Sequence, residues 1–230
     1  MRRFFVNIPS LKEDSITLPA EESKHACKVL RMSNGDQLEI VNGKGELFSG
    51  RIRVADSKRC IVDQEQYSFH EQDEYKIHIA IAPTKMNDRF EMFLEKATEL
   101  GIHEITPLLC SNSERKKIKH DRYNKVVISA MKQSKRLHLP QLNELTAFND
   151  FISSNKGLIA HCEDSEKTEL TSLLSPKECP IIIGPEGDFT LQEIEFALKN
   201  GFKPVTLGKT RLRTETAGLF ACMQAKLKFE

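Results

Sequence analysis

The chain has 230 residues, 39% of them hydrophobic, and a formal net charge of +1. This length allows one large domain or two small ones, and the near-neutral charge excludes a basic field over the whole surface, so nucleic-acid binding would depend on local patches. No signal-peptide pattern and no apolar run of membrane-spanning length is present, so we expect a cytoplasmic protein that binds no membrane.

The cysteines predict neither a metal site nor a disulfide framework. The six cysteines are scattered, with no C-x-x-C spacing and no matching histidine cluster. Reduced, mostly buried thiols are therefore expected, and no metal.

Residues 1–70 predict a small β-rich domain. The strand-like runs are Arg2–Val6, Gln37–Asn42, Leu47–Val54 and Cys60–Tyr67. The sequence Asn42-Gly43-Lys44-Gly45 indicates a hairpin turn, and Glu21–Leu30 is the one helix-like segment. This pattern suggests a small β-barrel of the kind that binds RNA. The polar stretch His70–Glu74 is a plausible linker to the rest of the chain.

From Tyr75 onward, strands and helices alternate. The expected strands are Ile77–Ala82, Glu104–Cys110 and Leu158–Cys162, and the expected helices are Asp88–Leu100, Lys125–Leu137 and a last one from about Thr216 to Phe229. Alternation of this kind predicts an α/β fold with a parallel sheet and helices on both of its faces. The last helix is apolar around much of its girth, which predicts burial in the domain or against a second subunit.

The stretch from Pro180 to Ala217 contains two further short strands. These are Pro180–Ile183 and Pro204–Leu207, joined by a helix that ends at Gly201 and begins with a capping-box pattern, Thr190 and Glu193. Each strand runs into a glycine-bearing loop, Gly184-Pro185-Glu186-Gly187 in the first case and Gly208 in the second. In open α/β sheets the carboxyl edge binds ligands, so the two loops predict a pocket. Neither nucleotide-phosphate glycine pattern is present.

Taken singly, the polar residues of this stretch have plain structural explanations. The glycine-proline loop could be an ordinary turn. Arg213 could form a structural pair with Glu215, or it could point a cation into the pocket, and Thr214 or Thr216 could cap the last helix.

Charged residues elsewhere can likewise have a plain structural explanation or a functional one. Basic residues cluster at Arg115–His120, at Lys132–Arg136 and around Lys24, His25, Lys28 and Arg31. Each cluster alone is most often a solvated face, but three of one sign on a near-neutral chain favour contact with an RNA backbone. The acidic side of the Asp88–Leu100 helix, with Glu91, Glu95 and Glu99, is best explained as a solvated face.

Together, these motifs resemble the RsmE-type 16S ribosomal RNA uridine-N3 methyltransferases of the SPOUT superfamily, nearly end to end. The matching stretches are Met1–Val6, His25–Met32 with Gly35-Asp36, Lys85–Glu91, Lys96–Ile102 with Pro107, Gln133–Pro140, Gly184–Gly187, and Leu207-Gly208 with Leu212–Ala217. The chain departs from the family pattern at three positions: Asp188 replaces a second glycine, Lys132 replaces a glutamate, and Arg211 replaces an isoleucine or valine.

The resemblance implies a PUA-like RNA-binding β-barrel at residues 1–70 and a trefoil-knotted α/β methyltransferase domain at residues 75–230. It also implies S-adenosylmethionine as cofactor, 16S rRNA of the small ribosomal subunit as partner, and a homodimer whose active site uses both subunits.

The same resemblance gives each candidate site residue a role. Arg213 and Arg136 would stabilise charge on the uracil, with Glu215 orienting Arg213. The cofactor would be held by Ile182, Ile183, Gly184, Glu186, Gly187, Leu207, Gly208 and Leu212. RNA would be bound by Arg2, Arg3, Lys24, His25, Arg31, Lys85, Arg89 and Lys132.

Two other functions stay open. The chain could be a SPOUT enzyme that methylates a ribose 2′-oxygen or another base atom, or a non-catalytic rRNA-binding assembly factor. A nicotinamide enzyme is disfavoured because the dinucleotide-binding glycine fingerprint is missing.

Overall fold

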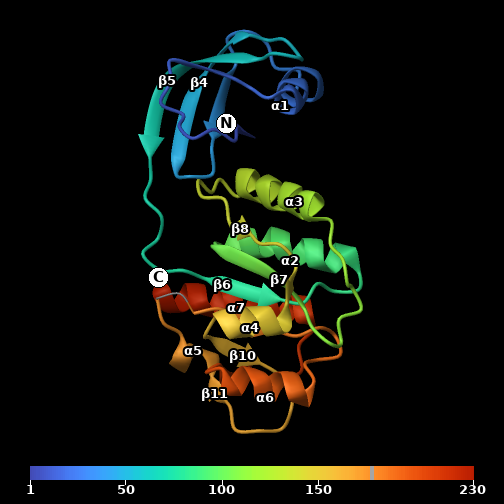
Figure 1. Ribbon diagram of the computed structural model, residues 1–230. Coiled ribbons are helices and arrows are strands. Elements are labelled where there is room, and N and C mark those ends of the chain that lie inside the picture. Colours follow the sequence, from blue (N-terminus) through green and yellow to red (C-terminus); the bar gives the residue numbers. More distant parts are fainter. Residues whose placement is uncertain (177–178) are drawn as a thin grey trace. The chain divides into compact units, whose positions relative to one another are not determined.

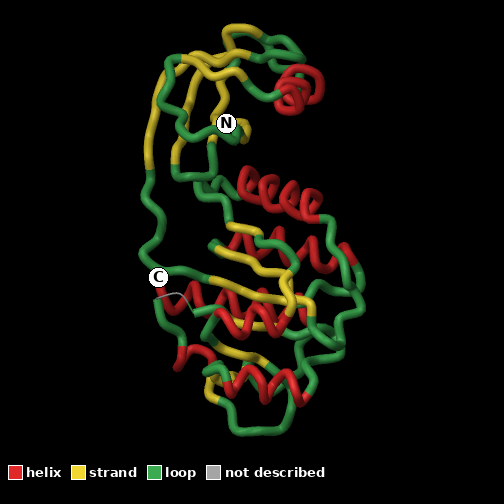
Figure 2. The backbone as a smooth tube through the Cα atoms, in the orientation of Figure 1, coloured by secondary structure: helices red, strands yellow, loops and turns green. Residues whose placement is uncertain are grey.

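The computed structural model describes residues 1–176 and 179–230 and divides into two compact units (Figure 1). The first contains Met1–Gln72 and also Met131–Leu139, and the second contains Asp73–Ala130 and Pro140–Glu230. The first unit is therefore not a continuous stretch of sequence. In its residues up to 72, strands outweigh helix, whereas the second unit alternates between helix and strand (Figure 2).

The first unit is built on a five-stranded sheet in the order β1-β3-β4-β5-β2. The strands are β1 (Arg2–Phe5), β2 (Ser15–Thr17), β3 (Gln37–Val41), β4 (Glu46–Val54) and β5 (Ile61–Phe69). β1 pairs with β3 in parallel and the other pairs are antiparallel. The hairpin predicted at Asn42–Gly45 is confirmed, whereas β2 was not predicted.

The helical part of this unit is less regular than the sequence predicts. An α-helix covers only α1 (Ala20–Lys24) and continues as a π-helical turn, η1 (His25–Val29). The core beneath these elements includes Phe4, Leu11, Leu38 and Phe48, which are fully buried.

Residues 131–139 join the first unit through the turn of the β3–β4 hairpin. The backbone N–H of Gly45 donates to Leu137 O at 3.0 Å, and that of Leu139 donates to Gly43 O at 2.9 Å. A Cβ at position 43 would lie 2.7 Å from the Cβ of Leu139, so this close approach requires glycine.

The second unit contains an eight-stranded sheet in which every pair is parallel. Its order is β11-β13-β10-β12-β6-β7-β8. The short strand β9 also pairs with β7, further along that strand than β8 does. The strands are β6 (His78–Ile81), β7 (Glu104–Leu109), β8 (Gln141–Leu142), β9 (Thr146–Ala147), β10 (Leu158–Ala160), β11 (Thr168–Glu169), β12 (Ile181–Ile183) and β13 (Lys203–Thr206). The predicted parallel α/β sheet is confirmed, while the trefoil knot stays a prediction.

The helices are α2 (Asn87–Leu100), α3 (His120–Gln133), α4 (Phe148–Ser154), α5 (Leu170–Leu173), α6 (Leu191–Lys199) and α7 (Thr214–Phe229). α3 both begins and ends before the predicted Lys125–Leu137. Its early end is explained by Lys135, which takes a left-handed conformation with φ of 59°. The capping box at Thr190 and Glu193 is confirmed.

Helices cover both faces of the sheet, as alternating side chains require (Figure 1). Ala80 and Ile182 face a core cluster with Phe151 of α4 and Ile194 of α6. The neighbouring Ile81 points the other way, toward Gly218 of α7. α7 packs on α2 at this second face.

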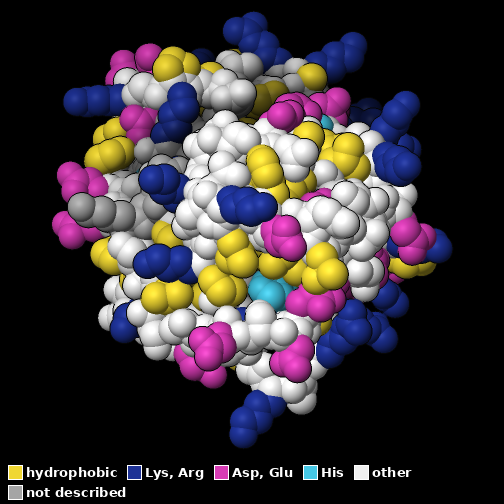
Figure 3. Space-filling model, turned by 60° about the horizontal axis from the view of Figure 1, so that its bottom comes forward, with side chains coloured by type: hydrophobic (Ala, Val, Ile, Leu, Met, Phe, Trp, Pro, Cys, Tyr) yellow, Lys and Arg dark blue, Asp and Glu magenta, His cyan; other side chains and the backbone are white. Residues whose placement is uncertain are grey.

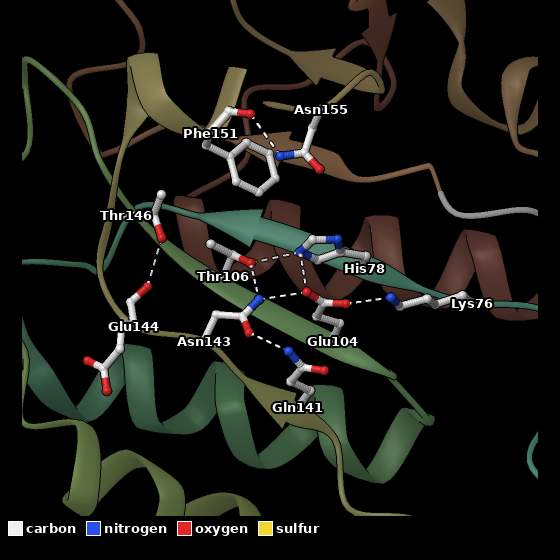
Figure 4. A network of polar contacts seen from close by, with 10 residues as sticks. All are labelled: Lys76, His78, Glu104, Thr106, Gln141, Asn143, Glu144, Thr146, Phe151 and Asn155. Atoms are coloured by element: carbon white, nitrogen blue, oxygen red, sulfur yellow. Dashed lines mark hydrogen bonds and ion pairs between the residues drawn. The ribbon is translucent and has the colours of Figure 1, made fainter. Parts of the chain in front are cut away.

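A buried polar network joins the amino ends of β6 and β7 (Figure 4). The Nδ2 of Asn143 donates to Glu104 at 2.6 Å and to Thr106 at 2.8 Å, and Lys76 pairs with Glu104 at 2.6 Å. Burial alone would raise the pKa of Glu104, but the Lys76 hydrogen bond and the nearby His78 outweigh it and hold that pKa below its ordinary value. This network therefore lies at the amino edge of the sheet.

Within the described residues, all six cysteines are free thiols. None of the described helices has both the length and the apolar character needed to cross a bilayer.

Candidate functional site

A pocket lies where three neighbouring strands end. β10 runs between β12 and β13, so their carboxyl ends lie together at one edge of the sheet. Two adjoining hollows of about 390 and 300 Å³ occur there. They share the lining residues Ala160, Cys162, Ile183, Arg211, Leu212 and Ala217. The hollows therefore form one site, within the size range of small-ligand pockets.

The two hollows differ in the loops that complete them. The larger is completed by the loops after β10 and β13, with His161, Lys167, Leu207 and Gly208. The smaller is completed by the glycine loop after β12, with Gly184, Glu186 and Asp188, and by Arg213. Most of the shared lining residues are apolar, whereas the residues that belong to one hollow only include charges of both signs, such as Lys167, Glu186 and Arg213.

Asp188 fixes the glycine loop. It adopts a left-handed conformation with φ of 63°, which Asp tolerates better than most residues. Its carboxylate accepts the backbone N–H of Phe189 at 2.8 Å and that of Cys162, on the loop after β10, at 2.7 Å. The aspartate that replaces the family's glycine therefore joins two walls of the pocket.

Loops after β6 and β7 support the glycine loop from the other side. The backbone N–H of Lys85 donates to Glu186 at 2.9 Å, and the Nδ2 of Asn112 donates to the carbonyls of Gly187 and Asp188 at 3.2 and 3.1 Å. Arg115 donates to the carbonyls of Thr84 and Lys85 at 2.9 and 2.6 Å. Arg115, which the sequence grouped with an RNA-binding cluster, is therefore a structural link between loops.

Thr214 ties the start of α7 to the same loop. Its hydroxyl donates to Gly184 O at 3.0 Å, and the residue is buried. The N-cap position of α7 is Arg213, which has no side-chain capping bond. The prediction that Thr214 or Thr216 caps this helix is therefore wrong, because the Thr214 hydroxyl is engaged across the pocket.

Arg213 and Glu215 do not pair with each other among the described residues. Arg213 is exposed and lines the smaller hollow, and its guanidinium has no hydrogen bond or ion pair to the part of the chain that is described. Glu215 is buried, and its nearest cation is Arg89, with Nε and Oε1 3.9 Å apart. The guanidinium of Arg213 is thus unpaired among the described residues, and Glu215 faces Arg89 rather than Arg213.

His161 supplies a buried polar group at the larger hollow. It is only 9% exposed, and neither ring nitrogen has a hydrogen-bond partner among the described residues. Burial lowers the pKa of His161, and the charge of Lys167 lowers it further. The neutral ring carries one donor and one acceptor, which suits a nucleoside-like ligand.

Most of the expected cofactor residues line this pocket. These are Ile183, Gly184, Glu186, Leu207, Gly208 and Leu212. Ile182 does not, because it faces the core cluster under α4 and α6, and Gly187 instead packs near Asn112. The sequence reasoning missed Ala160, His161, Cys162 and Lys167. The signal was available, since the predicted strand Leu158–Cys162 ends at the same edge.

The expected RNA-binding residues have mixed surroundings. In the first unit, Arg3 pairs with Glu39 at 2.8 Å and Lys132 with Glu22 at 2.6 Å. Arg2 donates to Leu30 O at 2.8 Å, while Lys24, His25 and Arg31 are exposed. Arg136 belongs to this unit and is half-buried. In the second unit, Lys85 pairs with Glu114 at 2.7 Å.

Family models match both parts of the chain. The model described as RNA methyltransferase domain matches residues 71–226, and the one described as RNA methyltransferase PUA domain matches residues 18–65. Ribosomal RNA small subunit methyltransferase E of Rickettsia conorii is 30% identical, over 98% of this chain and 95% of that protein.

Two solved structures have the same fold over nearly the whole chain. A protein from Porphyromonas gingivalis, described as a probable rRNA methyltransferase, is 37% identical with a TM-score of 0.86 and covers 98% of this chain and 99% of its own. Ribosomal RNA small subunit methyltransferase E of Neisseria gonorrhoeae was solved with S-adenosylmethionine bound. It is 27% identical with a TM-score of 0.86 and covers 96% of this chain and 95% of its own. The chain belongs to the family of ribosomal RNA small subunit methyltransferases E, the RsmE-type enzymes.

Proposed function

We propose that this protein transfers a methyl group from S-adenosylmethionine to N3 of a uridine in the 16S rRNA of the small ribosomal subunit, in the cytoplasm. The observation that carries this proposal is the pocket at the carboxyl ends of β10, β12 and β13, in a family whose Neisseria member was solved with S-adenosylmethionine.

The residues present fit this cofactor. The small side chains of Ala160 and Ala217 leave an apolar floor for a base, and the two unpartnered nitrogens of His161 offer polar partners at its side. Gly184 and Gly208 let backbone groups approach a ligand closely. We propose that Ile183, Leu207 and Leu212 form the apolar walls.

The chemistry requires stabilisation of charge on the uracil. S-adenosylmethionine, when bound, supplies a methyl group on a sulfonium. Loss of the N3 proton places negative charge on the two flanking carbonyl oxygens, and Arg213 is the exposed cation at the rim that would stabilise it. Arg136 remains a second candidate for this role. Because N3 of a paired uracil lies inside a duplex, the target base must be unpaired or displaced.

Glu215 has a revised role in this proposal. Its carboxylate is buried beside Arg89, and its Oε2 has no hydrogen-bond partner among the described residues. We propose that Glu215 orients Arg89 at the start of α2, near the same edge of the sheet, rather than Arg213.

We also propose that the protein acts as a homodimer. α7 exposes the apolar side chains of Phe220, Met223 and Leu227, which are 40%, 46% and 74% exposed. These residues recur at helical spacing along one stripe, a pattern suited to packing against a second copy.

The proposal is tested by nucleoside analysis. Purified protein is incubated with methyl-labelled S-adenosylmethionine and small subunits that lack the modification, and the digested rRNA is analysed. Label in 3-methyluridine supports the proposal. Label in a 2′-O-methylated nucleoside or in another methylated base would select a different reaction, and no label in rRNA with no cofactor affinity would indicate an assembly factor.

A further inference from the structure

We infer that four lysines just before and within the first half of α3 form a second RNA-binding surface, which holds rRNA phosphates next to the methyl-transfer pocket. This lysine patch consists of Lys116, Lys117, Lys119 and Lys125. The inference rests on the proposed function, because it assigns the patch to the same rRNA substrate.

The segment that carries the patch is far more basic than the chain as a whole. Between residues 115 and 125 there are six lysines and arginines and one aspartate, a formal charge of +5, whereas the whole chain carries +1. Figure 3 shows one face of the molecule, on which acidic and basic side chains are mixed. A local excess of this size attracts a polyanion even when the total charge is near zero.

The arginines of this segment are engaged within the protein, and the four lysines are not. Arg115 is bound to two backbone carbonyls, and Arg122 pairs with Glu91 at 2.5 Å. All four lysines of the patch are exposed, and no hydrogen bond or ion pair joins their ammonium groups to the described residues. Their charges are therefore available to a partner.

The surface around α3 is also hollowed. A hollow of about 600 Å³ is lined by Ile118, Lys119, His120, Asp121, Arg122 and Lys125. Its lining includes three cations, Lys119, Arg122 and Lys125, against one carboxylate, Asp121, and one aliphatic side chain, Ile118. Such a basic hollow suits a phosphate backbone better than it suits an apolar side chain or a base.

The patch begins next to the cofactor pocket. Asn112, three residues before Arg115, donates to the carbonyls of the glycine loop, and Arg115 itself holds the loop that bears Lys85. Only one residue separates Arg115 from Lys117. A strand of RNA bound on the patch would therefore run close to the base that is methylated, so the patch would position substrate without touching the reacting atoms.

The test compares two quadruple variants with equal changes in charge. In one, Lys116, Lys117, Lys119 and Lys125 are replaced by Gln. In the control, Lys156, Lys199, Lys203 and Lys228 are replaced by Gln. The control lysines are exposed and lie at the ends of elements on the opposite, amino edge of the sheet. Affinity for a uridine-rich single-stranded RNA and for small subunits is measured between about 0.05 and 0.2 M salt.

We expect the patch variant to lose at least about tenfold in affinity for both probes. The plot of log K against log salt should become less steep by about 3, because four phosphate contacts contribute about 0.7 each. The control variant should keep both values, and both variants should keep the S-adenosylmethionine affinity and thermal stability of the wild type. Unchanged RNA affinity and slope in the patch variant would overturn the inference. So would a loss confined to small subunits, since that result would place a ribosomal protein on the patch. Failure of the wild type to methylate subunits would overturn the proposed function separately.

Discussion

The carboxylate of Asp188 accepts the backbone N–H of Cys162 at 2.7 Å and so joins the loop after β12 to the loop after β10. Both residues line the smaller hollow, and Cys162 also lines the larger one. The same carboxylate accepts the N–H of Phe189 at 2.8 Å. A charged acceptor shared by two backbone donors stabilises a loop more strongly than a neutral one.

Replacement of Asp188 by Gly should weaken S-adenosylmethionine binding by about tenfold, equivalent to about 1.4 kcal/mol. Glycine keeps the left-handed backbone but removes the acceptor, so the two pocket walls lose their link. Calorimetric titration measures the dissociation constant. Asp188→Asn, which keeps one carbonyl oxygen, should lose less. An unchanged dissociation constant in the glycine variant would show that the link does not shape the cofactor pocket.

Replacement of Thr214 by Val should lower the free energy of unfolding by about 1–3 kcal/mol, since the buried carbonyl of Gly184 loses its hydroxyl donor. Chemical denaturation measures this loss. Thr216→Val is the matched control, because Thr216 lies on the same turn of α7 but is exposed. Equal effects of the two substitutions would contradict the role given to the Thr214 hydroxyl.

Replacement of Arg213 by Ala should lower kcat by about 10²–10³-fold, the usual cost of removing one donor that stabilises developing charge. The affinity for S-adenosylmethionine should persist, because Arg213 lines only one of the two hollows. Single-turnover kinetics with saturating cofactor measures the effect. Arg213→Lys keeps the charge without the planar fork and should retain part of the activity. Loss of cofactor binding in the alanine variant would instead make Arg213 a residue that holds the ligand.

His161 should make stability depend on pH. Burial lowers its pKa from the ordinary value of 6.5, so below pH 6.5 the unfolded chain binds a proton that the folded chain does not. Folding stability is therefore complete above pH 6.5 and falls as the pH drops toward the lowered pKa. The difference in Tm between the wild type and His161→Asn should grow more favourable to the wild type as the pH rises from about 5 to 6.5. His25→Asn, at an exposed position, is the control. A pH-independent difference for His161→Asn would contradict this account.

The sequence predicted the positions of helices and strands along the chain better than it predicted which strands pair with one another. Hydrophobic periodicity located β12, α6 and β13 to within about two residues, because local patterning decides such elements. It did not reveal that β10 lies between β12 and β13, since strand order depends on pairing between distant segments. His161 and Cys162 were missed from the site for this reason.

Single side chains with more than one possible partner were the hardest to predict. Thr214 suits a helix cap by sequence, but its hydroxyl reaches the glycine loop thirty positions earlier. Arg115 lies in a basic run and yet binds carbonyls that sequence spacing does not reveal. Asp188 departs from the family pattern, and the contact with Cys162 that explains it exists only once β10 and β12 are paired.

The central claim is most directly tested by reverse transcription of 16S rRNA. Small subunits that lack the modification are incubated with S-adenosylmethionine and with the wild type or the Arg213→Ala variant. Methylation at N3 blocks Watson–Crick pairing, so the account predicts a stop at one uridine with the wild type and little or no stop with the variant. A wild-type reaction that transfers label to rRNA without any such stop would contradict uridine N3 as the target.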